Sequence, residues 1–94
     1  MKELVKLFKA LANENRIRIL QLIIQEGPIS LSEIAKTLNI PIKTASKYLI
    51  VLENVDLVST KLEDGKKYFY LPHLFQEDPQ MEILKILKRY KTKK

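Results

Sequence analysis

Apolar residues recur every three or four positions over the first half of the chain, which is the spacing of amphipathic helices. A first helix is predicted over residues 2–12 and a second over residues 14–26. Asn13 suits the amino terminus of the second helix, and Gly27-Pro28 ends it, because glycine permits a left-handed exit and proline blocks continuation. The polar side of this helix is narrow, so we expect it at the centre of the core. The apolar stripe of the first helix is formed by Leu4, Leu7, Phe8 and Leu11.

Two shorter helices follow. Ser30 and Glu33 have the spacing of a capping box, which predicts the start of a third helix that ends at Asn39. Pro41 favours the first turn of a helix, so a fourth helix is predicted over residues 41–54 after a turn of about three residues. Two short helices joined by a tight turn form a helix-turn-helix, although ordinary helix hairpins share this arrangement.

From residue 57 to residue 71 the pattern changes to strand-forming residues on both sides of Asp64-Gly65, a pair that favours a tight hairpin turn. Asp78-Pro79 then predicts the start of a last amphipathic helix. The fold class is therefore mainly α with a small β-hairpin, in the order of a winged helix-turn-helix. We expect a single domain over residues 1–94, with a basic tail from about residue 91 whose order the sequence leaves open.

The formal net charge of +6 at pH 7 depends on the end of the chain. Residues 1–84 contain eleven basic and eleven acidic residues, so their net charge is zero. The excess lies in the last ten residues, where a solvated tail would produce the same total. Net charge alone therefore does not identify a polyanionic partner. The basic residues of this end are Lys85, Lys88, Arg89, Lys91, Lys93 and Lys94.

Several classes of function find no support in the composition. The chain has no cysteine, which excludes disulfides and thiolate metal ligands. Its apolar runs are too short for a membrane span or a signal peptide, so we expect a cytoplasmic protein. His73 is the only histidine and has no ligand cluster at metal-binding spacing. We find no nucleophile with a base and no phosphate-binding loop, and therefore predict neither an enzyme nor a bound cofactor or metal.

Two stretches resemble a known family. Residues 11–20 read Leu-Ala-Asn-Glu-Asn-Arg-Ile-Arg-Ile-Leu, and residues 46–49 read Ser-Lys-Tyr-Leu with Leu52 three positions later. Together with the order of elements, these motifs resemble the ArsR-type family of small dimeric winged-helix repressors over nearly the whole chain. Tyr48 stands where that family often has histidine, and Asp56 stands where it usually has glycine. Asp tolerates left-handed backbone geometry better than most residues, so the second departure is mild.

The resemblance implies double-stranded DNA as a partner and a homodimer formed by the terminal helices. Many ArsR-type proteins sense metals through a Cys-x-Cys pair at the start of the third helix, and this chain has Ser30 and Ser32 there. Hydroxyls are poor ligands for soft metals, so the chain resembles a member without the usual metal switch. Any small-molecule effector stays unidentified.

Candidate DNA contacts follow from the periodicity of the fourth helix. Ala45, Leu49 and Leu52 form its core stripe, which turns the opposite side of the amino-terminal half outward. The outward residues expected at base edges or phosphates in a major groove are Ile42, Lys43, Thr44, Ser46 and Lys47. In the hairpin, phosphate or minor-groove contacts are expected from Lys61, Lys66 and Lys67.

Some alternatives stay open at this stage. Lysines on exposed helix faces and hairpin tips are also common in proteins that bind no DNA. Ile42 and Ile50 would suit a winged helix that docks a protein partner instead. Arg16 is either a DNA-backbone contact or a structural ion-pair partner. The terminal helices could also pack on their own core in a monomer. For the homodimer, the residues expected at the interface are Leu4, Leu7, Phe8, Leu11, Leu84, Leu87 and Tyr90.

Overall fold

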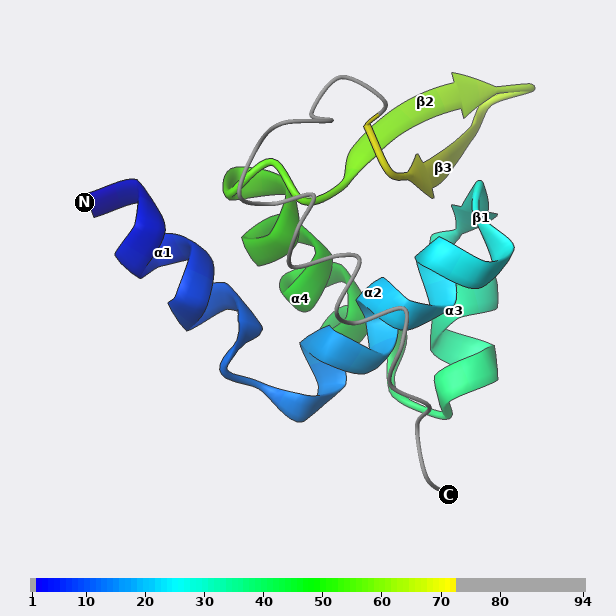
Figure 1. Cartoon of the computed structure of the whole chain (residues 1–94). Helices are drawn as coiled ribbons and strands as arrows, with labels where there is room; N and C mark the ends of the chain where they lie inside the picture. Colours follow the sequence, from blue (N-terminus) through cyan, green and yellow to red (C-terminus); the bar gives the residue numbers. More distant parts are fainter. Residues whose placement is uncertain (1, 73–94) are drawn as a thin grey trace.

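The structure is a computed structural model that describes residues 2–72 (Figure 1). The predicted last helix and the predicted basic tail lie outside the described residues. So do three of the residues expected at a dimer interface, Leu84, Leu87 and Tyr90. A small sheet lies across one end of a group of helices (Figure 1). In chain order the elements are α1 (Lys2–Leu11), α2 (Glu14–Glu26), β1 (Ile29–Ser30), α3 (Leu31–Leu38), α4 (Ile42–Asn54), β2 (Ser59–Glu63) and β3 (Lys66–Tyr70).

The ends of α2 are set by Asn13 and Gly27. The Asn13 side chain accepts a hydrogen bond from the Arg16 backbone N–H at 3.0 Å, as predicted for an N-cap. The prediction of a left-handed exit at Gly27 was wrong, because the φ of Gly27 is −64°. A Cβ at this position would lie 2.6 Å from the Ile23 carbonyl oxygen, so glycine is needed for close approach of the backbone.

The predicted capping box of α3 is present. The Ser30 hydroxyl accepts from the Glu33 backbone N–H at 3.3 Å, and the Glu33 carboxylate accepts from the Ser30 backbone N–H, also at 3.3 Å. Asn39 ends the helix in left-handed geometry, with φ 57°. Pro41 then serves as the N-cap of α4, so the helix begins one residue later than predicted. These caps fix a short turn between α3 and α4.

A third strand, β1, was not predicted. It pairs antiparallel with β3, so the sheet has the order β1-β3-β2. The register places Ile29 opposite Phe69 and Ser30 opposite Tyr68. A strand of two residues is too short to show a period in the sequence. Its position matters, because it joins the start of α3 to the hairpin.

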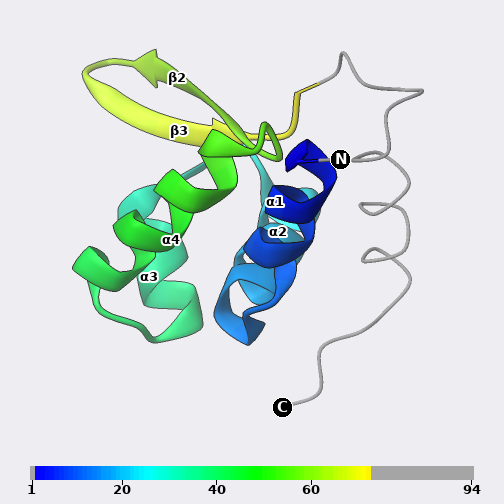
Figure 2. The same ribbon diagram turned by 90° about the vertical axis from the view of Figure 1, so that its left-hand side faces the viewer.

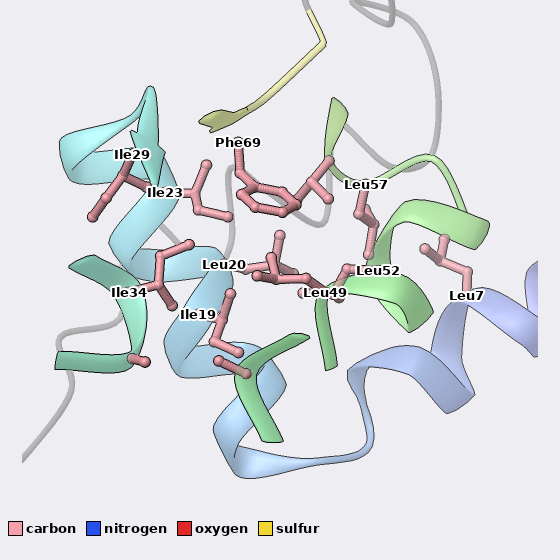
Figure 3. Packing of buried hydrophobic residues seen from close by; sticks show 13 residues of the cluster. Leu7, Ile19, Leu20, Ile23, Ile29, Ile34, Leu49, Leu52, Leu57 and Phe69 are labelled. Atoms are coloured by element: carbon pink, nitrogen blue, oxygen red, sulfur yellow. The ribbon is translucent and has the colours of Figure 1, made fainter. Parts of the chain in front are cut away.

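The core lies between α2, α3, α4 and the sheet (Figure 3). As predicted, α2 is the central helix and buries Ile19, Leu20 and Ile23. In Figure 3, Phe69 of β3 points toward these residues from the sheet. The cluster also contains Leu7, Ile29, Ile34, Ala35, Ala45, Leu49, Leu52, Leu57 and Val58. Burial of this contiguous apolar set is the main force that holds the helices and the hairpin together.

The hairpin has the predicted tight turn at Asp64-Gly65. Both residues have positive φ, 54° and 77°, which suits a two-residue turn between twisted strands. Asp56 also has positive φ, 62°, as its position in place of a glycine suggests. β2 begins at Ser59, later than the strand-forming pattern indicates, because its pairing with β3 begins there. Leu57 and Val58, ahead of the strand, are buried in the core.

Candidate nucleic-acid interface

One face of α4 is buried and the opposite face is open to solvent. Ala45, Leu49 and Leu52 are no more than 1% exposed, which confirms the predicted core stripe. Lys43 and Lys47 are exposed and lie four residues apart, hence on neighbouring turns of one face. The helix is therefore held by its buried side while two ammonium groups project from the other.

Two exposed isoleucines accompany these lysines. Ile42 and Ile50 are each 54% exposed. Ile50 lies three residues after Lys47 and seven after Lys43, so it belongs to the same face. Ile42 lies at the first residue of the helix. The exposed face of α4 thus combines positive charge with apolar groups.

Thr44 and Ser46 are half-buried, at the edges of this face. Hydroxyls accept and donate hydrogen bonds, so each suits either a base edge or a phosphate oxygen. The structure brings Ile42, Lys43, Ser46 and Lys47 to the amino-terminal half of one exposed surface. Thr44 lies at the other edge of this surface from Ser46.

The three hairpin lysines are exposed but do not share a face. Leu62 pairs with Lys67, and Thr60 pairs with the buried Phe69, so Lys67 lies on the side of the hairpin that turns toward the core. Its ammonium lies 5.8 Å from the centre of the Phe69 ring. Lys61 and Lys66 lie on the opposite side, and Lys66 is paired with Glu63. Positive charge is therefore distributed around the hairpin.

The hairpin and α4 lie on the same side of the molecule. Figure 2 shows the hairpin turn and the amino end of α4 directed away from α1. The hairpin turn and the amino-terminal half of α4 are therefore not separated by α1. This arrangement fits a duplex whose major groove receives a helix and whose adjacent backbone meets a flanking loop.

Arg16 has a structural position that neither of its two sequence-based interpretations anticipates. Its Nε donates to the Ala10 carbonyl oxygen at 2.6 Å, and a terminal guanidinium nitrogen donates to the Lys9 carbonyl oxygen at 3.1 Å. Its Cζ lies 5.5 Å from the centre of the Tyr48 ring. Arg16 therefore contacts the end of α1 and the middle of α4. In the sequence, this contact is indicated only by the position of Arg16 in the first turn of α2, just after the turn that ends α1.

The apolar residues of α1 divide into two groups. Leu7 is 3% exposed and belongs to the core, and Leu11 packs against the core. Leu7 was predicted at the dimer interface, but it is buried within its own chain. Leu4 and Phe8 are 38% and 56% exposed. Val5, which the stripe missed, is 49% exposed and lies one turn before Phe8.

Ser30 and Ser32, which the family resemblance places where metal-sensing members have cysteines, lie at the start of α3. The Ser30 hydroxyl donates to the Glu33 carboxylate at 3.0 Å and lies 3.3 Å from the Ser32 hydroxyl oxygen. Across residues 2–72, His, Cys, Asp and Glu side chains form no group of three or more that could hold a metal ion. In the same part of the chain, no helix has the length and apolarity to cross a membrane.

A helix-turn-helix, formed by α3 and α4, that is followed by the β2–β3 hairpin defines a winged helix-turn-helix domain. A sequence model described as a helix-turn-helix domain matches residues 11–60, more than half of the chain. The chain belongs to this helix-turn-helix family, and its structural relatives are winged-helix regulators of the ArsR type. A comparison with curated proteins gives no match.

Solved structures agree with this assignment over nearly the whole chain. The chain is similar to HlyU from Vibrio cholerae, with 26% identity, a TM-score of 0.78, and coverage of 94% of this chain and 90% of HlyU. It is similar to the transcriptional regulator HlyU from Vibrio vulnificus, with 28% identity, a TM-score of 0.73, and coverage of 92% and 84%. A third similar structure is the homodimeric winged helix-turn-helix DNA-binding domain Mb0332 from Mycobacterium bovis, a possible ArsR-family regulator. It has 26% identity, a TM-score of 0.75, and coverage of 92% and 72%.

Proposed function

We propose that the chain is a homodimeric transcriptional regulator that binds double-stranded DNA in a sequence-specific manner and represses transcription from a pseudo-palindromic operator. The observation that carries this proposal is the exposed face of α4, where Lys43 and Lys47 project from a helix fixed by a buried stripe. A fixed helix can present side chains to base edges at a defined depth in the major groove. Lysine can donate there to guanine O6 and N7.

Ile42 supports base reading rather than simple charge attraction. It is 54% exposed at the first residue of α4 and has no core role. A branched apolar side chain at that position suits contact with a thymine methyl group. The hairpin lysines would meet phosphates beside the groove, which adds affinity without sequence preference.

Dimerisation is supported by the exposed apolar side of α1, formed by Leu4, Val5 and Phe8. A second copy that covers this side would produce a two-fold axis, as expected for most small homo-oligomers. The similar domain Mb0332 is homodimeric. Two recognition helices would then address half-sites about one helical turn apart, roughly 34 Å. We further propose repression, because occupancy of an operator that overlaps a promoter excludes polymerase.

The proposal is tested by selecting bound sequences from a random duplex library and measuring affinity for the selected operator over a salt series. We expect a two-fold symmetric consensus and an affinity that falls steeply as salt rises. Replacing Lys43 and Lys47 by alanine should abolish the preference for the consensus over random duplex. Lys2 and Lys9, both exposed on α1, supply a matched control that removes the same charge elsewhere. Unchanged binding by the α4 variant would refute the proposal.

A second candidate function is docking of a protein partner on α4. The exposures of Ile42 and Ile50 favour it, because both are large apolar groups on an accessible helix face. In that case the selection would give no consensus. Replacing both isoleucines by serine would remove capture of a partner, whereas alanine at Lys43 and Lys47 would have little effect.

A further inference from the structure

Arg16 lies where α1, α2 and α4 meet. From α2 it donates two hydrogen bonds to carbonyl oxygens at the end of α1, those of Ala10 and Lys9. Its guanidinium also lies against the Tyr48 ring of α4, 5.5 Å from the ring centre. A planar guanidinium is suited to both roles at once, since it donates in its plane and stacks with its face. One side chain thus connects the proposed dimerisation helix to the proposed recognition helix.

This connection matters because α1 has few other attachments. Among the α1 side chains whose exposure is described, only Leu7 and Ala10 are buried. Leu11 packs against the core as a half-buried residue, so the apolar contacts of α1 lie along one stripe. The hydrogen bonds from Arg16 are made at the carboxyl end of α1, where a positive charge also interacts favourably with the helix dipole. Arg16 therefore adds directional hydrogen bonds to the apolar contacts at the carboxyl end of α1.

Tyr48 places the other end of the connection next to the DNA-facing residues. It follows Lys47 and precedes the buried Leu49, and it is half-buried against the core. Through the Tyr48 ring, Arg16 therefore joins the end of α1 to the helix turn that carries Lys47.

We propose that Arg16 is a positioning residue that sets the spacing and orientation of the two recognition helices in the dimer. This inference rests on the proposed function, since it assumes that α1 pairs across the two-fold axis and that α4 reads DNA. In a dimer, each recognition helix is located relative to its partner through α1. A fixed angle between α1 and α4 then selects one distance between half-sites. Arg16 does not itself need to touch DNA.

The test measures affinity for a set of operators whose half-sites are separated by the selected spacing, or by one or two base pairs more or fewer. The wild-type protein should prefer one spacing, and Arg16→Met should reduce that preference by about five-fold or more, the lower range of coupling between sites. Arg18→Met is the matched control. Arg18 lies on the same helix and donates to Asn15 of that helix at 3.4 Å, so its loss should leave the preference unchanged.

Two Tyr48 variants examine the same connection from α4. Tyr48→Leu removes the aromatic ring and should relax the spacing preference as Arg16→Met does. Tyr48→Phe keeps the ring face and should retain the preference. If Arg16→Met loses its helical circular dichroism, the comparison between the two Tyr48 variants decides the matter.

The possible results separate this inference from the proposed function. If the wild-type protein selects no consensus, the proposed function fails first. If it selects a symmetric operator and Arg16→Met or Tyr48→Leu weakens binding equally at every spacing, the residues are only structural and the inference is overturned. A wild-type protein that binds all spacings equally would also overturn it. Relaxed spacing with unchanged affinity for a single half-site would support it.

Discussion

α4 and the β2–β3 hairpin both expose lysines, but they hold them in different ways. α4 is fixed by three side chains that are no more than 1% exposed, and its lysines project from the opposite face. In the hairpin, every residue from Lys61 to Lys67 is exposed, and Phe69 is the buried residue of its two strands. A lysine on α4 therefore has a defined position relative to the core, whereas a lysine near the hairpin turn has more freedom. This difference suggests that α4 discriminates between sequences and that the hairpin contributes affinity.

The largest effect is expected from the buried side of α4. Leu49→Ala should lower the free energy of unfolding by about 2–5 kcal/mol, because it leaves a cavity in the close-packed core. Ile50→Ala is the matched control, since Ile50 is the next residue and is 54% exposed. It should change the free energy of unfolding by only ~0.5 kcal/mol. Thermal or denaturant unfolding at fixed protein concentration measures both, and equal losses would contradict the orientation of α4.

The next largest effect concerns base discrimination by α4. Lys47→Ala should reduce the preference for the consensus base at one position of each half-site by about 1–3 kcal/mol. The measurement compares affinities for the operator and for duplexes substituted at each position in turn. A loss spread evenly over all positions would assign Lys47 to phosphate contact and would remove the contrast with the hairpin.

The features of α4, the hairpin and the other helices that could be predicted from the sequence are those that depend on local residue chemistry. Asn13 and Ser30 cap helices through their side chains, and Pro41 fixes its own φ ahead of α4. The starts of α2, α3 and α4 could therefore be placed to within one residue. The core stripe of α4 followed from its period. The turn at Asp64-Gly65 followed from two residues that tolerate positive φ.

The parts that were not predictable depend on contacts between distant segments. β1 is recognisable only through its pairing with β3. Leu7 and Leu4 belong to one sequence stripe, and their different burial follows from how α1 lies against the other helices. The role of Arg16 also depends on distant segments. Its hydrogen bonds reach α1, and the Tyr48 ring that it lies over is 32 residues farther along the chain. Lysines at the hairpin alternate between its two faces, and only the register shows which face turns toward the core.

A smaller effect is expected at the hairpin turn. Gly65 has φ 77° and no atom within 4 Å of the position a Cβ would take, so Gly65→Ala introduces backbone strain without a clash. We expect a loss of about 1 kcal/mol in the free energy of unfolding. Gly65→Asn is the control, because asparagine tolerates left-handed geometry and should cost less. An alanine variant as stable as the wild type would show that the turn does not hold this conformation.

The smallest effects are expected from single hairpin lysines. If each contacts a phosphate, alanine at Lys61, Lys66 or Lys67 should lower the slope of log affinity against log salt by about 0.9, with the same loss for the operator and for random duplex. Lys9→Ala, at an exposed position on α1, is the control for removal of one charge. Because Lys66 and Lys67 lie on opposite sides of the hairpin, a reduced slope for only one of them would identify the side that meets DNA. That result would contradict contact by all three lysines. A loss confined to the operator would instead show that the hairpin, like α4, reads sequence.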